Sequence, residues 1–361
     1  MSAVSSPDVR VGPRSATLDG FDRVPTAPVR DRYVDLVRVA AVVAVILGHW
    51  FVIAITVRDG RLSGQNVLAV LPWTHGLTWV FQVVPLFFFV GGYANAASWS
   101  AFANAGADWA GWLSARGERL LRPTTIYLAV ALLAATVARA AGVYPDVVDG
   151  AAWLVAIHLW FLAIYLVVVA AAPMMLAAHR RWGATVVVLL VTAVAAVDVL
   201  RLGFDVPHIG MLNYALVWAA IHQVGFLWRG GALPQRSLPA AALAGAGLVA
   251  LIVLTGPGPY PVSMVNVPGA ELQPTAPPGL SILALAAFQA GVVLALRHPA
   301  ERWLVRPRPR AIVARLGDGV MTLFLWHLVP VVFGAAILYA TGLIPRAEIG
   351  SGSWLALRVV W

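Results

Sequence analysis

Apolar residues in this chain gather into nine stretches, each close to the length of about 20 residues that a helix needs to cross a bilayer. The stretches lie near 36–56, 77–97, 124–141, 153–176, 183–200, 213–228, 238–254, 280–296 and 320–340. A tenth begins at Trp354 and has only eight residues, too few to span. The pattern predicts an all-α, polytopic transmembrane helical bundle of about ten helices with the last one truncated. A short re-entrant or interfacial end is the alternative.

Polar segments frame these stretches. Residues 1–32 are polar and have no apolar core like that of a signal peptide, so we predict a disordered cytoplasmic tail followed by one transmembrane domain at 33–361. The segment 255–279 is rich in proline and glycine, which excludes a regular helix there. It either lines an outward-facing substrate site or simply connects two spans.

Composition supports the membrane assignment and excludes several chemistries. The chain is 60% hydrophobic and 11% charged, whereas soluble domains carry about 25% charged residues. All 25 basic residues are arginine and there is no cysteine. The chain therefore has no lysine for a Schiff base, no thiol nucleophile and no disulfide. We also expect no metal site and no bound cofactor.

The arginines orient the predicted bundle. If the N-terminus is cytoplasmic, the inner segments hold eighteen arginines and the outer loops hold five. This asymmetry follows the positive-inside rule and predicts a multi-pass protein of the plasma membrane with its N-terminus in the cytoplasm. It also accounts for the net charge of +9, so we expect the lipid bilayer as a partner and no nucleic acid.

Arg38 and His49 lie inside the first apolar stretch, where ionisable side chains are costly and by default functional. Eleven residues separate them, which on a helix is about 20° beyond three full turns and a rise of about 16 Å. The two side chains therefore share one helix face at different depths. Asp35 precedes Arg38 by one turn and is placed to hold it. The alternative is a snorkelling Arg38 and a His49 that only bonds within the bundle.

Other polar residues in the apolar stretches carry weaker signals. His327 is either a second polar group of a site or a packing hydrogen bond, and His158 is either interfacial or functional. His222 and Gln223 are predicted to join helices through hydrogen bonds. Asp198, near the outer end of its stretch, is expected to be solvated.

The run RYVDLVRVAAVVAVILGHW resembles the first helix of the acyltransferase 3 family of integral membrane acyltransferases. In that family Asp-x-x-Arg precedes a histidine, as Asp35, Arg38 and His49 do here. Further segments resemble the family in the same order: VVPLFFFVGGYANA, SARGERLLRPT, HLWFLAIYL and MTLFLWHLVP. Gly91 stands where serine is common, and Tyr165 takes the approximate place of a glutamate. The resemblance covers about 33–361.

The resemblance implies transfer of an acyl group, acetyl by default, from cytoplasmic acyl-CoA to a hydroxyl of a sugar, glycolipid or glycosylated natural product. His49 is then the catalytic base, or a nucleophile that forms an acyl-histidine. The donor phosphates would lie in a basic mouth, with Asp35 in support, that is made of Arg38, Arg116, Arg119 and Arg122. Candidate supporting groups near the reaction are Tyr93, Trp160 and His327.

Acyl-CoA is thus expected as a co-substrate, and a sugar or glycoconjugate as the acceptor. Two alternatives stay open. One is N-acetylation of an amino sugar. The other is a transporter or flippase of a lipid-linked sugar, although the inverted repeats typical of transporters are not visible in the sequence.

Overall fold

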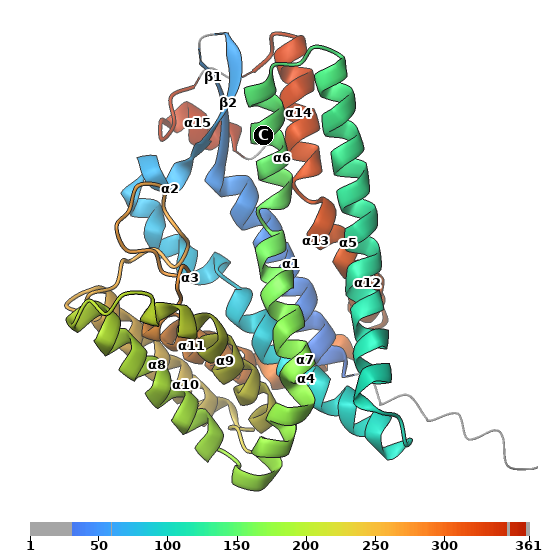
Figure 1. Cartoon of the computed structure of the whole chain (residues 1–361), viewed down its shortest axis with the longest axis vertical. Helices are drawn as coiled ribbons and strands as arrows, with labels where there is room; N and C mark the ends of the chain where they lie inside the picture. Colours follow the sequence, from blue (N-terminus) through green and yellow to red (C-terminus); the bar gives the residue numbers. More distant parts are fainter. Residues whose placement is uncertain (1–30, 59, 345–346, 359–361) are drawn as a thin grey trace, which may run out of the picture.

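The computed structural model describes residues 31–58, 60–344 and 347–358. The predicted cytoplasmic tail therefore lies outside the described residues, except for Asp31 and Arg32. Within the described part, nine helical segments are long and apolar enough to cross a membrane, and the strands form a single two-stranded sheet. The predicted all-α polytopic bundle is confirmed (Figure 1).

The spans and the short elements follow each other in a simple order. The long helices are α1 (Arg32–Val52), α4 (Val84–Asn104), α5 (Trp109–Ala140), α7 (Leu159–Trp182), α8 (Thr185–Gly203), α9 (Asn213–Arg229), α10 (Ser237–Thr255) and α11 (Leu280–Leu304). One span consists of α13 (Val320–Trp326) and α14 (Val329–Ala340), and α6 (Pro145–Ala156) extends α7. The remaining elements are β1 (Ile53–Arg58), β2 (Arg61–Asn66), α2 (Val67–Val70), η1 (Pro72–Leu77), α3 (Thr78–Phe81), η2 (Ile209–Leu212), α12 (Pro307–Asp318) and α15 (Gly352–Leu357).

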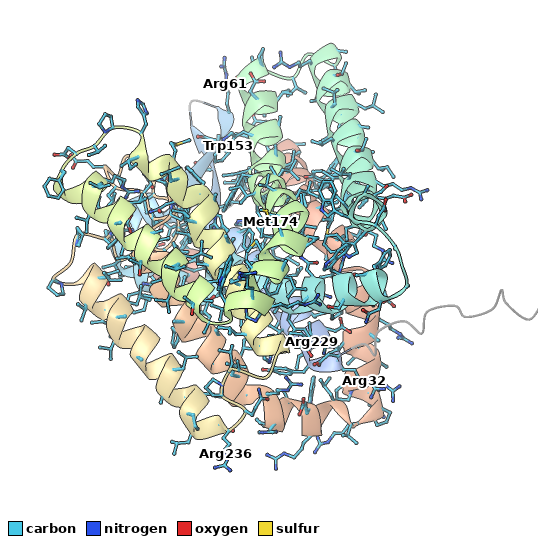
Figure 2. All side chains as sticks on the ribbon, turned by 60° about the horizontal axis from the view of Figure 1, so that its bottom comes forward. Arg32, Arg61, Trp153, Met174, Arg229 and Arg236 are labelled. Carbon is cyan, nitrogen blue, oxygen red and sulfur yellow. The ribbon has the colours of Figure 1, made fainter. Side chains whose placement is uncertain are left out.

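The bundle has two chemically different ends. Figure 2 shows Arg32, Arg229 and Arg236 at one end, which we call the basic end. Arg61 and Trp153 lie at the opposite end, where β1 and β2 pair in antiparallel register; we call this the hairpin end. Helix α1 runs from the basic end to the hairpin end and therefore contributes residues to both (Figure 1).

Three predicted boundaries were wrong. The helix formed by the first apolar stretch ends at Val52, and the β-branched residues that follow form strand β1. The third span begins at Trp109 rather than at 124, because the Asp108 carboxylate caps α5 by accepting a hydrogen bond from the Gly111 N–H at 2.8 Å. The stretch 77–97 is interrupted between α3 and α4, one residue before the proline-containing first turn of α4.

The last apolar segment forms the six-residue helix α15, which packs at the hairpin end. The Trp354 and Phe51 rings lie 6.3 Å apart, centroid to centroid. The Arg358 guanidinium donates to the backbone carbonyls of Trp50 and Ile53. Helix α15 therefore covers the point where α1 gives way to strand β1.

Two pairs of helices, α4 with α9 and α10 with α11, cross at glycines. A Cβ atom on Gly92 of α4 would lie 2.0 Å from the His222 carbonyl oxygen of α9. A Cβ atom on Gly247 of α10 would lie 2.3 Å from the Phe288 nitrogen of α11. Membrane helices associate through such close backbone contacts, since water provides no hydrophobic drive between them. These crossings form a closely packed group of helices, α4, α9, α10 and α11, which we call the packed body.

Polar side chains join the same helices. Asn95 bonds to His222 at 3.1 Å and Gln223 bonds to the Met175 carbonyl at 3.2 Å, so the prediction for His222 and Gln223 is confirmed.

The solvated position expected for Asp198 was wrong, because this residue is only 3% exposed. Its carboxylate accepts hydrogen bonds from Asn213, from the Tyr260 hydroxyl and from the Leu280 N–H that begins α11. Burial and this carboxylate raise the pKa of Tyr260. These bonds hold the segment 256–279, which contains no regular helix, as predicted.

Candidate active site

A helix break orients the first histidine of the site. Helix α13 ends at Trp326, and α14 begins at Val329 with Pro330 in its first turn. Because proline has no N–H, the helix ladder is interrupted here and nearby carbonyls become available to side chains. The Phe324 carbonyl accepts a hydrogen bond from His327 Nδ1 at 2.7 Å, and the His327 carbonyl accepts one from the Trp50 indole at 2.8 Å.

His327 in turn fixes the tautomer of His49. The Nε2 atom of His327 lies 2.7 Å from Nδ1 of His49, and the two rings stack at an interplanar angle of 15°. Since His327 donates through Nδ1 to a carbonyl, its Nε2 in the neutral ring is an acceptor, and His49 Nδ1 must carry the proton that they share. His49 Nε2 is then unprotonated, which is the form required of a general base or a nucleophile.

His158 is the third histidine of this cluster. It lies in the break between α6 and α7, with its ring centroid 5.2 Å from that of His327. The residue is 4% exposed, and neither ring nitrogen has a hydrogen-bond partner among the described residues. Buried polar atoms are nearly always paired in folded proteins. The described residues therefore leave both nitrogens of His158 buried and unpaired.

A large cavity opens from these histidines toward the hairpin end. Its volume is about 1420 Å³, and its lining includes His49, His158 and Trp160. Helices α5, α6 and α14 supply much of its described lining, and the β1–β2 hairpin and the segment 265–276 supply further residues. A molecule that occupies this cavity can contact His49 directly.

Three phenylalanines of the cavity lining pack against one another. The ring of Phe161 lies 5.3 Å from that of Phe87 and 5.8 Å from that of Phe324, centroid to centroid. All three line the cavity, and no arginine of the described residues does so. We call this group, Phe87, Phe161 and Phe324, the aromatic partition.

The predicted arginines gather on the far side of the partition. Asp35 and Arg38 form an ion pair at 3.7 Å. Arg116 of α5 donates to the Ala94 carbonyl at 3.4 Å and lies close enough to Arg38 and Arg119 to be repelled by both. Arg122 follows one turn later on α5 and is exposed. The sequence-predicted basic group is thus assembled from α1 and α5.

Tyr93 lies apart from the histidines. Its hydroxyl donates to Asp31 at 2.9 Å and accepts from Arg229 at 3.3 Å. Asp31 caps the start of α1, about 27 Å of helix rise from His49. Of the three supporting residues named from the sequence, His327 contacts His49, Trp160 lines the same cavity as His49, and Tyr93 joins the basic end.

The family model described as an acyltransferase domain matches residues 31–361, nearly the whole chain. The chain belongs to the acyltransferase 3 family. No curated protein and no solved structure matches it. The protein is therefore a multi-pass membrane acyltransferase.

Two positions where this acyltransferase departs from its family pattern contact each other. A Cβ atom on Gly91 would lie 2.9 Å from the Tyr165 ring and 3.0 Å from its hydroxyl. Tyr165 therefore occupies the space that a serine side chain at position 91 would need. Tyr165 also interacts with Arg116, so the pair lies between the arginine group and the aromatic partition.

Sequence reasoning left the role of His158 open, and it did not find the His49–His327 bond. A histidine at the end of a span is equally compatible with an interfacial and a functional position. The bond joins residues 278 positions apart, which no local pattern records. The one local signal was the proline three residues after His327, which marks a helix break with free carbonyls.

Proposed function

We propose that this acyltransferase transfers an acyl group, acetyl by default, from acyl-CoA to a hydroxyl group of a sugar or glycoconjugate. The donor enters at the basic end, which we place in the cytoplasm, and the acceptor enters from the hairpin end. The observation that carries the proposal is His49: His327 leaves its Nε2 unprotonated, and the ring lines a cavity of about 1420 Å³.

The basic end suits the donor. Acyl-CoA carries three phosphate groups, and guanidinium groups bind phosphate through paired hydrogen bonds. Arg116 is repelled by both Arg38 and Arg119, so a bound anion lowers the energy of the group. Arg122 extends the same surface along α5. Asp35 keeps Arg38 in position through their ion pair.

The transfer step requires a general base and a nucleophilic attack on the thioester carbonyl. His49 Nε2 takes the proton of the acceptor hydroxyl while the hydroxyl oxygen attacks the thioester carbonyl. The carbon–sulfur bond breaks, the acyl–oxygen ester forms, and the CoA thiolate takes the proton from His49. The Trp160 indole, which lines the same cavity as His49, is the side-chain donor that we propose for the developing oxyanion. To reach His49, the thioester passes the aromatic partition.

A double displacement is the variant of this scheme. In it, His49 Nε2 attacks the thioester first, releases CoA and passes the acyl group to the acceptor in a second step. Mass spectrometry of the protein after incubation with acetyl-CoA and no acceptor distinguishes the two. A His49 peptide heavier by one acetyl group supports the double displacement, and an unmodified peptide supports direct transfer.

The function itself is tested by comparing extracts. Membrane, envelope and small-molecule extracts of the source strain and of a strain without the gene are analysed by mass spectrometry. We expect at least one product to lose one acyl unit in the deletion strain, and purified protein with acetyl-CoA to restore it. Lability of the restored group to mild alkali identifies an ester, whereas a stable amide would favour the amino-sugar alternative. Identical extracts and no restoration would overturn the proposal.

A further inference from the structure

The cavity above the histidines differs from the basic end in charge. Apart from its histidines, the only ionisable acid or base that carries charge in the described lining is Asp146. Asp146 pairs with Arg61 at 3.6 Å at the hairpin end, so its charge is compensated. A carboxylate or phosphate inside the cavity would find no cationic partner and would lose its hydration.

The walls of the cavity are apolar and lined by small residues. On α5 the lining includes Ala131, Ala134 and Ala138, and on α14 it includes Val332 and Ala336. Sites for small molecules usually measure roughly 300–1,000 Å³, so this cavity of about 1420 Å³ is larger than a single sugar ring requires. The apolar walls along α5 and α14 favour a ligand with a large apolar part.

Polar side chains line the cavity at both of its ends. On the β1–β2 hairpin they include Ser63 and Gln65. At the inner end lie His49 and His158, and His158 is buried beside the ring of His327 with both nitrogens unpartnered among the described residues. In a neutral imidazole one nitrogen accepts a hydrogen bond and the other donates one. The cavity therefore combines apolar walls on α5 and α14 with hydrogen-bonding groups at its ends.

We propose that this cavity is the acceptor site and that it selects an uncharged amphipathic alcohol, such as a neutral glycoside with an apolar aglycone. The hydroxyl-bearing part lies at His158 and His49, and the apolar body lies along α5 and α14. The inference rests on the proposed function and narrows its acceptor: lipid-linked sugar phosphates and acidic glycans are excluded by the missing cationic partner.

Three probes with matched parts test the selection. Protein in lipid nanodiscs receives acetyl-CoA with decyl glucoside, methyl glucoside or decyl glucuronide. We expect decyl glucoside to be acetylated most efficiently. The efficiency with methyl glucoside should be lower by about 10-fold or more because it lacks the apolar body. The efficiency with decyl glucuronide should be lower by about 10-fold or more because it adds an uncompensated charge. Equal efficiency for methyl glucoside, or a preference for the glucuronide, would overturn the inference.

Variants separate the cavity from simple partition of the alkyl chain into lipid. Ala134→Phe and Ala336→Phe fill the cavity, and we expect both to reduce the preference for decyl over methyl glucoside. Leu133→Phe and Ile337→Phe are the matched controls, because these neighbouring residues are exposed (64% and 61%) and do not line the cavity. A preference that is unchanged in all four variants would contradict the inference.

A binding measurement keeps the test valid if glucose is not turned over. A decyl glucoside with a diazirine in its chain is photolysed with the protein, and the labelled peptides are mapped. Labels on α5, α6 and α14 that Ala134→Phe removes and Leu133→Phe retains support the inference. Labels confined to lipid-facing residues would contradict it, as would decyl glucuronide that competes as well as unlabelled decyl glucoside.

Two further outcomes distinguish a failure of this inference from a failure of the proposed function. A preference for decanoyl-CoA over acetyl-CoA that is lost in Ala134→Phe would assign the cavity to the donor chain and overturn the inference alone. Mapped cavity labels without acetyl-CoA-dependent acylation of any probe or extract would contradict the proposed function while leaving the neutral, apolar binding site in place.

Discussion

The two ends of helix α1 deal differently with the free-energy cost of placing polar side chains in a membrane. At the basic end, charge is gathered and paired: Asp31 accepts from Tyr93 and Arg297, and Asp35 pairs with Arg38. In the cavity toward the hairpin end, the described lining holds one charged side chain, Asp146, which pairs with Arg61, and the inner polar groups are the rings of His49 and His158. One helix thus connects a region suited to an anionic molecule with a region suited to an uncharged one.

The proposed function requires a single site to bind two dissimilar substrates, and this difference suits both. In that proposal, the phosphates of acyl-CoA bind where guanidinium groups are concentrated, and the uncharged alcohol binds where they are missing. The aromatic partition links these regions, because its rings line the cavity while Phe161 stacks on Tyr165, which interacts with Arg116. Only the thioester and the attacking hydroxyl need to meet there.

His327→Phe removes the group that orients His49, and it tests the hairpin end. We expect kcat to fall by about 100-fold or more, the usual contribution of a positioned base, with the KM for acetyl-CoA unchanged. His327→Gln keeps an acceptor for His49 Nδ1 and should recover part of the rate. Steady-state kinetics of both variants provide the measurement. Equal loss in the two would assign His327 a packing role instead.

Arg116→Leu tests the basic end. We expect the KM for acetyl-CoA to rise by about 10-fold, in line with the loss of one charge-assisted contact, while the KM for acetyl-pantetheine, which lacks the nucleotide phosphates, stays constant. Arg139→Leu is the control, because Arg139 lies at the other end of the same helix and pairs with Asp149. A parallel rise for both donors would contradict phosphate binding by Arg116.

Phe161→Leu tests the aromatic partition. The smaller side chain should admit water from the cavity to the thioester, so we expect hydrolysis of acetyl-CoA without acceptor to rise several-fold. Phe204→Leu, at an exposed ring (71%), should behave as the wild type. Release of free CoA in the absence of acceptor is the readout. Unchanged hydrolysis in Phe161→Leu would show that these rings do not separate the two regions.

Gly247→Ala has the smallest expected effect on catalysis, because it lies in the packed body rather than at either end of α1. The new Cβ atom would lie 2.3 Å from Phe288 N, so we expect a loss of about 1–3 kcal/mol in stability and a normal rate per folded molecule. Gly245→Ala has open space around its Cβ and should be neutral or stabilising. Thermal unfolding in detergent compares them. Equal stability would refute the close crossing.

Much of this arrangement follows from sequence, and the reasons for the failures are physical. The spans were visible because bilayer-length apolar runs leave few alternatives. Arg38 and His49 were found because both lie on one such run. The β1–β2 hairpin was missed because its first strand continues the same apolar run, where length alone does not distinguish strand from helix.

The composition of the histidine cluster depended on tertiary structure. His49, His158 and His327 come from three separate spans, and only the packing of α1 against the two helix breaks brings them together. Asp198 shows the same limit. Its position near a span end favoured solvation, whereas the fold places it under the N-terminus of α11 with three hydrogen-bond donors.

In the proposed function, His49 carries the transfer between the two ends of α1, and the variant His49→Ala tests this role. Wild-type protein and His49→Ala, both in nanodiscs, are compared for acetylation of the acceptor with labelled acetyl-CoA and for equilibrium binding of acetyl-CoA. We expect transfer to fall by about 100-fold or more with donor binding unchanged, since the arginines remain. Full transfer activity in His49→Ala would contradict it.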